Sequence, residues 1–303
     1  MTGSIIVTGT AGFIGSWVAK QLLELGWSVT AFDREADDRK LRANAGDEAA
    51  SRVTWHAGDI ANPDTVKALF EAARPDRVIH LAAVLIPVCR DTPVTGALID
   101  VIGHINIFEA AHAVGCDQVV YASSAAATAR RGDGTLTTVY GSYKRWCEEF
   151  SAVRHHERGT HSIGLRPAIV YGPGREAGAT AFVNAAITEA VAGREHTLPT
   201  RWNHRVEHVE EVADAFVRCA TTPIEGAHAS DITTTNTNDE DFLAALRQAI
   251  PDCRVDPADS ESFREAAPAD TSVLEGLIGP LHGISLEEGV ARTVAAMRQS
   301  GGS

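Results

Sequence analysis

The sequence predicts an α/β protein built on a doubly wound parallel sheet, with a smaller C-terminal α/β region. Three observations carry this prediction. Short apolar segments rich in β-branched residues alternate with longer helical segments through the first half of the chain. The short segments lack a polar/apolar alternation, as is typical of strands that helices cover on both faces. The pattern changes after residue 167, where irregular loops become more frequent.

The expected elements of the first half follow one another in strict alternation. We expect strands at residues 5–7, 29–32, 53–55, 78–81, 118–122 and 161–165, and helices at residues 13–25, 63–74, 94–114 and 140–157. The second helix has the clearest start, because Asn62 suits an N-cap and Pro63 suits the first turn. The repeated strand–helix order predicts parallel strands.

We predict two regions along the chain. Residues 1–167 are expected to form the main domain, and residues 168–303 mostly a smaller substrate-binding region, with some chain returning to the main core. The segment Gly172-Pro173-Gly174 interrupts the regular pattern of strands and helices near the start of the second region. Helices are expected there at about residues 182–192 and 211–221.

Composition excludes several classes of function. The net charge of −13 argues against nucleic acid and anionic membranes as partners. We expect neither a signal peptide nor an apolar run of membrane-spanning length. The five cysteines are scattered and contain no C-x-x-C pair, which favours reduced, buried thiols in a cytoplasmic protein. We expect no metal site, since His204 and His208 lack an accompanying carboxylate motif.

A glycine-rich segment joins the first expected strand to the first expected helix. Gly9, Gly12 and Gly15 are spaced G-x-x-G-x-x-G. Gly9 permits a tight turn, Gly12 lets the backbone approach a pyrophosphate, and Gly15 lets helix and strand pack closely. Because the helix N-terminus favours anions, this junction predicts a dinucleotide site on a Rossmann sheet.

An acid at the end of the second strand selects the dinucleotide. Asp33 follows the apolar segment 29–32 and can accept hydrogen bonds from both ribose hydroxyls of NAD. The same carboxylate would repel the 2′-phosphate of NADP. The neighbouring Arg34 could instead pair with that phosphate. We predict NAD as the cofactor, with NADP as the less favoured alternative.

A second constellation carries the chemistry. Tyr140 and Lys144 are four residues apart at the start of a helix, so their side chains share one face. Ser123 and Ser124 end the fifth strand, at the sheet edge where doubly wound folds bind ligands. We predict Ser124, Tyr140 and Lys144 as catalytic residues, with Ser124 also binding substrate. Tyr143, one residue from Lys144, is expected to have a packing or pocket-lining role.

This set of residues suits hydride transfer to or from a secondary alcohol. A phenol with a pKa of about 10 is too weak a base near neutral pH. We expect the ammonium of Lys144 and a positively charged nicotinamide ring to lower the pKa of Tyr140. Tyr140 would then exchange the hydroxyl proton, while Ser124 holds the substrate oxygen.

These motifs together resemble the extended short-chain dehydrogenase/reductase superfamily, in its NAD-dependent sugar epimerase/dehydratase branch. Matching stretches are Thr8 to Gly15, Gly58-Asp59-Ile60, His80 to Ala83, Val120 to Ala125, Tyr140 to Lys144, Arg166 to Gly174, Arg205 to Val212 and Ile284 to Gly289. The resemblance implies that Ser124 rather than Ser123 is catalytic. It also implies that the cofactor contacts Phe13, Ile14, Asp59, Ile60, Leu81, Ala82, Ala83, Tyr140, Lys144 and Pro167.

The chain departs from this branch at positions close to the substrate. Ile169 and Asp100 each stand where the branch commonly has an asparagine, and His104 replaces a threonine. The loop 125–139 is shorter than usual. Arg175 and Arg205 are the candidate substrate-binding residues, because a guanidinium grips carboxylate or phosphate in bidentate fashion.

Three functions remain open at this point. The departures favour an NAD-dependent oxidoreductase that acts on a secondary hydroxyl of a sugar-like or sugar-acid substrate. The alternative is an epimerase, acting on a sugar or nucleotide sugar, that oxidises transiently and keeps NAD bound. A non-catalytic NAD-binding protein is the minor alternative. Relatives commonly dimerise through the two long helices near 94–114 and 140–157, so a homodimer is expected, with Trp146 and Phe150 at the interface or in the core.

Overall fold

The computed structural model describes residues 3–178, 180–259, 263–265, 268–281 and 283–300. The chain forms two compact units. Unit 1 comprises residues 1–167, 213–232 and 270–280, and unit 2 comprises residues 168–212, 233–269 and 281–303. The chain therefore returns to unit 1 twice after leaving it.

Unit 1 is built on a parallel sheet of seven strands, in the order β11-β6-β5-β4-β1-β2-β3. The strands are β1 (Ser4–Thr8), β2 (Ser28–Asp33), β3 (Thr54–Ala57), β4 (Arg77–His80), β5 (Gln118–Ala122), β6 (His161–Arg166) and β11 (Ala227–Asp231). The order reverses at β1, between β2 and β4, so the carboxyl end of β1 is a switch point at which such folds bind ligands. The predicted fold class is confirmed.

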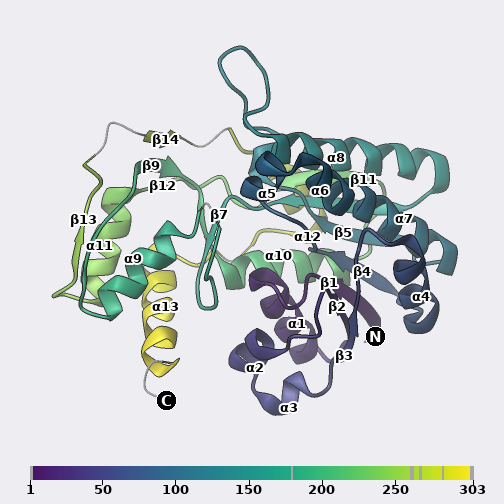
Figure 1. Cartoon of the computed structure of the whole chain (residues 1–303), viewed down its shortest axis with the longest axis horizontal. Coiled ribbons are helices and arrows are strands. Elements are labelled where there is room, and N and C mark those ends of the chain that lie inside the picture. Colours follow the sequence, from purple (N-terminus) through teal and green to yellow (C-terminus); the bar gives the residue numbers. More distant parts are fainter. Residues whose placement is uncertain (1–2, 179, 260–262, 266–267, 282, 301–303) are drawn as a thin grey trace. The chain divides into compact units, whose positions relative to one another are not determined.

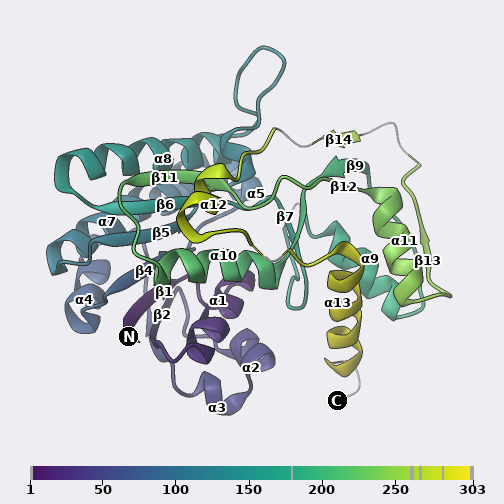
Figure 2. The same cartoon turned by 180° about the vertical axis from the view of Figure 1, so that it is seen from behind.

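Helices cover both faces of this sheet (Figures 1 and 2). One face carries α4 (Pro63–Ala73), α7 (Gly103–Val114) and α8 (Val139–Arg158). The other carries α1 (Phe13–Glu24), α12 (Ser272–Ile278) and the part of α10 (Val209–Thr221) from Ala213 onward. Shorter helical segments are α2 (Arg39–Ala45), α3 (Asp47–Ala50), α5 (Ile86–Asp91), α6 (Pro93–Ala97), η1 (Leu98–Ile102) and η2 (Ala125–Ala127).

Local sequence explains where several of these elements begin and end. Asn62 caps α4 by accepting hydrogen bonds from the backbone N–H groups of Asp64 and Thr65. Arg74 ends the helix in the left-handed conformation. The core on the α4/α7 face is apolar and includes Phe70, Ile107 and Phe108. Burying these side chains supplies most of the driving force for packing helices on the sheet.

The predicted helical stretch at residues 94–114 is confirmed, since the chain is helical from Pro93 to Val114. Within it the structure shows a feature that was not predicted. The stretch consists of α6, then a π-helical turn η1, then α7. A π turn inserts an extra residue and rotates the side chains that follow. The short helices α2, α3 and α5 and the returning strand β11 were not foreseen as individual elements.

The same run corrects one expectation. Pro93–Val114 is 22 residues long, and an 18-residue window within it has a mean hydropathy of 1.3, which meets the length and composition of a membrane span. The expectation that no apolar run reaches that length was therefore wrong. Half of that window is buried inside the protein. Its side chains Ile107 and Phe108 belong to the core, as in the central helix of a Rossmann unit.

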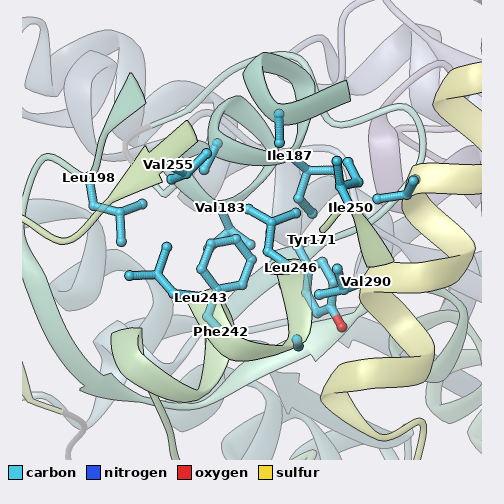
Figure 3. Packing of buried hydrophobic residues seen from close by; sticks show 14 of the residues in the cluster. Tyr171, Val183, Ile187, Leu198, Phe242, Leu243, Leu246, Ile250, Val255 and Val290 are labelled. Atoms are coloured by element: carbon cyan, nitrogen blue, oxygen red, sulfur yellow. The ribbon is translucent and has the colours of Figure 1, made fainter. Parts of the chain in front are cut away.

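Unit 2 has its own core, drawn in Figure 3. It contains β7 (Ile169–Tyr171), α9 (Phe182–Val191), β8 (Glu195–Thr197), β9 (Arg201–His204), β10 (Val206–His208), β12 (Thr237–Asn238), α11 (Asp239–Ala249), β13 (Arg254–Asp256), β14 (Phe263–Glu265) and α13 (Leu286–Ser300). The side chains of Val183 and Ile187 from α9, Phe242 and Leu246 from α11, and Val290 from α13 converge in this core (Figure 3).

Candidate active site

The glycine-rich turn between β1 and α1 is shaped by steric limits. Gly9 has φ +75°, and a Cβ there would lie 2.8 Å from the backbone nitrogen of Ala82. A Cβ on Gly15 would overlap the carbonyl oxygen of Gly9. Gly12 precedes the first residue of α1 and makes no side-chain cap. The backbone therefore packs closely while the N-terminus of α1 keeps its positive dipole for a ligand.

A pocket of about 390 Å³ lies over this turn. Nine of the predicted cofactor residues line it: Gly9, Gly12, Asp33, Arg34, Asp59, Ile60, Leu81, Ala82 and Ala83. Five further lining residues were not predicted: Ala11, Phe32, Gly58, Val84 and Ile99. The other predicted contacts do not line the pocket: Phe13, Ile14, Gly15, Tyr140, Lys144 and Pro167. Gly58 and Ala11 lie inside motifs that were recognised, whereas Val84 and Ile99 carried no sequence signal.

Asp33 faces this pocket from the end of β2. Its Oδ2 accepts a hydrogen bond from the backbone N–H of Ala11 at 3.0 Å, and its Oδ1 accepts one from the backbone N–H of Arg34 at 2.7 Å. These bonds hold the carboxylate at the pocket wall next to the glycine turn. An acid in this place suits a ribose diol and repels an added phosphate. The pocket therefore fits NAD, which Asp33 and the N-terminus of α1 would hold.

The structure brings Tyr140, Lys144 and Ser124 together. Thr138 caps α8 by accepting a hydrogen bond from Gly141 N–H, so Tyr140 and Lys144 lie in the first turns of the helix. Tyr140 and Lys144 are buried, and Lys144 Nζ lies 5.6 Å from the centre of the Tyr140 ring. Lys144 Nζ also donates to the carbonyl of Ala122 at 2.9 Å. Ser124 is close enough to Tyr140 that its hydroxyl lowers the pKa of the phenol.

The net effect on the pKa of Tyr140 is the reverse of our expectation. Burial raises the pKa of the phenol, and this outweighs the lowering by Lys144. Asp100 raises the pKa of Tyr140 further. Burial alone would lower the pKa of Lys144, but Tyr140 and Asp100 reverse this, so it ends raised. The lowering of the Tyr140 pKa by Lys144 was predicted correctly, whereas the burial of the phenol could not be predicted from local sequence.

The neighbouring serine has a different environment. Ser123 is buried, and its Oγ donates to Glu148 Oε1 at 2.5 Å. Glu148 in turn pairs with Arg166 through both carboxylate oxygens at 2.7 Å. Ser123 therefore belongs to a network that ties α8 to β6. This leaves Ser124 as the hydroxyl beside Tyr140. The hydroxyl of Tyr143 makes a different contact, because it donates to the carbonyl of Pro93 at 2.9 Å.

Unit 2 contains the two arginines predicted to hold an anion. Arg175 is half-buried at a pocket of about 710 Å³ and donates to Thr180 Oγ1 at 3.0 Å. Arg205 is only 1% exposed. Ile169 is 2% exposed and belongs to the core of unit 2. His208 is also in the interior, edge-on to the ring of Tyr171.

Comparison with known proteins decides the family. Residues 5–233 match the NAD dependent epimerase/dehydratase family. The chain belongs to this family. Membership confirms the resemblance drawn from the motifs, and with it an NAD-dependent enzyme of the short-chain dehydrogenase/reductase type. NAD is accordingly the cofactor.

Two named relatives show how far the sequence similarity extends along the chain. UDP-glucose 4-epimerase of Mycolicibacterium smegmatis is 27% identical over 97% of this chain and 98% of that protein. UDP-glucose 4-epimerase 3 of rice is 36% identical, but the match covers 40% of this chain and 34% of the rice protein. The chain thus spans about a third of the rice relative and nearly all of the bacterial one.

Solved structures share the fold. The crystal structure of UDP-glucose 4-epimerase from Thermotoga maritima, solved with UDP-glucose, superposes with a TM-score of 0.82. It is 22% identical, over 98% of this chain and 99% of that one. At this identity the likeness supports the Rossmann architecture alone.

Proposed function

We propose that the protein is an NAD-dependent epimerase that inverts the C4 hydroxyl of a nucleotide-linked hexose, with UDP-hexoses as the first substrates to test. The observation that carries this proposal is the buried Tyr140–Lys144 pair, with Ser124 close to the phenol, in a unit that also holds the cofactor pocket. The full-length similarity to a UDP-glucose 4-epimerase favours epimerisation over net oxidation.

In this proposal each side chain has a defined task. Bound NAD, held by Asp33 and the N-terminus of α1, would supply the hydride acceptor and donor that inversion at the substrate carbon needs. Tyr140 accepts the hydroxyl proton during oxidation and gives it back during reduction. Ser124 hydrogen-bonds the substrate oxygen. Lys144, fixed on the carbonyl of Ala122, stabilises the phenolate charge.

A second candidate is a dehydrogenase that releases NADH after oxidising a smaller sugar-like alcohol or sugar acid. The specific observation in its favour is Ile169, an apolar core residue in place of the asparagine that the branch usually presents to substrate phosphates. Losing that contact weakens the case for a nucleotide group. The half-buried Arg175 could hold either a phosphate or a carboxylate.

One experiment separates the two candidates. Purified protein is incubated with UDP-glucose or UDP-galactose, and separately with free sugars and sugar acids, while NADH absorbance is followed with added NAD. We expect the 4-epimer to form, as measured by chromatography, without net NADH. Sustained NADH formation from a small alcohol, with no isomer from any UDP-hexose, would replace the proposal by the dehydrogenase.

We also propose that the protein is a cytoplasmic homodimer. Exposed apolar side chains follow both long helices of unit 1: Val94, Leu98 and Ile102 on the α6–η1–α7 run, and Val139, Trp146 and Val153 on α8. The last three are seven residues apart, so they form one stripe along α8. Phe150, in contrast, packs against the core. A second copy of this face would bury these side chains, as in a four-helix bundle.

The dimer is tested by placing a charge in the stripe. Trp146 is 39% exposed, and Trp146→Glu should convert the dimer to a monomer, because an unpaired carboxylate would be buried at the interface. Leu25→Glu is the matched control, since Leu25 is an exposed apolar residue at the end of α1. Light scattering after size exclusion measures the mass. A monomeric unmodified protein, or a Trp146→Glu dimer, would contradict the proposal.

A further inference from the structure

The chain around Ser124 is fixed by hydrogen bonds of the residues on either side of it. The carbonyl of Ala122 accepts a hydrogen bond from Lys144 Nζ at 2.9 Å. On the other side, the backbone N–H of Ala125 donates to the carbonyl of Pro167 at 3.0 Å. The position of the Ser124 hydroxyl therefore depends on what holds its neighbours.

The side chain of Ser123 connects the same segment to α8. Ser123 is 2% exposed and Glu148 is 8% exposed, and Ser123 Oγ donates to Glu148 Oε1 at 2.5 Å. A short bond from a hydroxyl to a carboxylate is of the strong, charge-assisted kind. Glu148 lies on α8, four residues after Lys144 and eight after Tyr140, so the three side chains share one side of the helix. The bond therefore fixes the serine segment relative to the helix that carries the phenol.

Glu148 also holds the segment that binds the other side of the serine. Arg166 donates to Glu148 Oε1 through Nε and to Oε2 through Nη2, both at 2.7 Å. Arg166 directly precedes Pro167, the residue whose carbonyl accepts the N–H of Ala125. One carboxylate thus holds the residue before Ser124 and the segment that binds the residue after it.

The bond from Ser123 is not needed to join α8 to β6. The two hydrogen bonds between Glu148 and Arg166 already make that connection. The backbone ladder between β5 and β6 ends at Ala122 and Leu165, so Ser123 and its neighbour lie beyond it. What the Ser123 hydroxyl adds is a connection from the end of β5 to the Glu148–Arg166 pair.

We propose that Ser123 is a positioning residue, which through its bond to Glu148 holds Ser124 in the place where Ser124 meets the substrate oxygen. A hydrogen bond that acts on the reacting atoms loses much of its effect when the donor is slightly displaced. This inference deepens the proposed function and rests on it for the task of Ser124. The hold on the end of β5 exists in the protein by itself.

A double-mutant cycle tests whether Ser123 acts through Ser124. Ser123→Ala removes the hydroxyl and leaves the Glu148–Arg166 pair intact. We expect kcat to fall about tenfold, with NAD affinity unchanged, because the reacting hydroxyl is displaced. In a Ser124→Ala background, the same change should lower kcat by less than about twofold, since the hydroxyl to be positioned is gone. A purely structural loss would instead lower kcat by the same factor in both backgrounds.

Ser151→Ala is the matched control for removing one buried hydroxyl. Ser151 is 1% exposed and lies on α8, where its Oγ donates to the carbonyl of Cys147 at 2.8 Å. This variant should keep the kcat of the unmodified protein. A tenfold loss of kcat in Ser151→Ala would mean that any buried hydroxyl on this side of the sheet has the same effect, and would overturn the inference.

A second measurement does not depend on turnover. Amide hydrogen exchange, followed by NMR, reports how firmly the Ala125 N–H is held on the carbonyl of Pro167. We expect this amide to exchange about tenfold faster in Ser123→Ala, because one charge-assisted bond no longer holds the segment, and to be unchanged in Ser151→Ala. Unchanged exchange in Ser123→Ala, or equal kcat losses in both backgrounds, would overturn the inference. Inactivity of the unmodified protein would count against the proposed function, and the exchange of Ala125 would still decide whether Ser123 holds the segment.

Discussion

Replacing Tyr140 by phenylalanine is expected to lower kcat by about 10³-fold, because the site loses the group that exchanges the substrate proton. The phenol is buried beside Lys144 and close to Ser124, and it is not among the residues that line the cofactor pocket. NAD binding should therefore persist. Steady-state kinetics and a calorimetric titration with NAD measure the two quantities on the same preparation.

Tyr143→Phe is the matched control for this experiment. Tyr143 also follows the start of α8, but its hydroxyl donates to the carbonyl of Pro93. Removing that hydroxyl takes away one hydrogen bond at a half-buried position, so most of the activity should remain. Full activity of Tyr140→Phe would contradict the assigned proton exchange. Loss of activity in Tyr143→Phe alone would transfer that task to the other phenol.

The second large effect is expected at Gly15. A Cβ at this position would overlap the carbonyl oxygen of Gly9 and lie 2.8 Å from Cα of Thr10, and both of these atoms belong to the backbone. Gly15→Ala must therefore push α1 away from the turn. We expect the variant to lose about 3 kcal/mol of unfolding free energy, the range of severe packing errors. It should also lose the thermal stabilisation that bound NAD gives to the unmodified protein.

Gly132→Ala separates this steric effect from the general cost of replacing a glycine. No atom lies within 4 Å of a Cβ at Gly132, and its φ is not in the left-handed region. The control should change the unfolding free energy by less than about 0.5 kcal/mol, as surface substitutions usually do. Thermal melts with and without NAD measure both variants. A Gly15→Ala protein that melts and binds NAD like the control would contradict the packing described for the turn.

The sheet was predictable because its strands are short apolar segments that are easily recognised in the sequence. The fifth strand was expected at residues 118–122, and the structure has β5 at the same residues. A short apolar segment between turn signals is typical of a strand that is buried on both faces. The helix at residues 63–74 was similarly clear, because Asn62 and Pro63 mark its start.

The π turn and the pocket walls were not predictable in the same way. Leu98–Ile102 has ordinary helical residues, so the sequence does not indicate the π turn in which Asp100 is buried. The one available sign that Asp100 is unusual was that it is a lone acid within an apolar segment. Val84 and Ile99 line the cofactor pocket because of the tertiary fold, and no local motif indicates this. The pKa of Tyr140 depends on burial by segments distant in sequence, which local patterns do not reveal.

The most direct test of the proposed epimerase follows the hydrogen that the cofactor carries. UDP-glucose with deuterium at C4 is incubated with the protein in ordinary water, and the product is examined by mass spectrometry and NMR. Transient oxidation by bound NAD predicts the 4-epimer with deuterium retained at C4 and no net reduced cofactor. Accumulation of reduced cofactor, loss of the deuterium to water, or no epimer from any UDP-hexose would contradict the account.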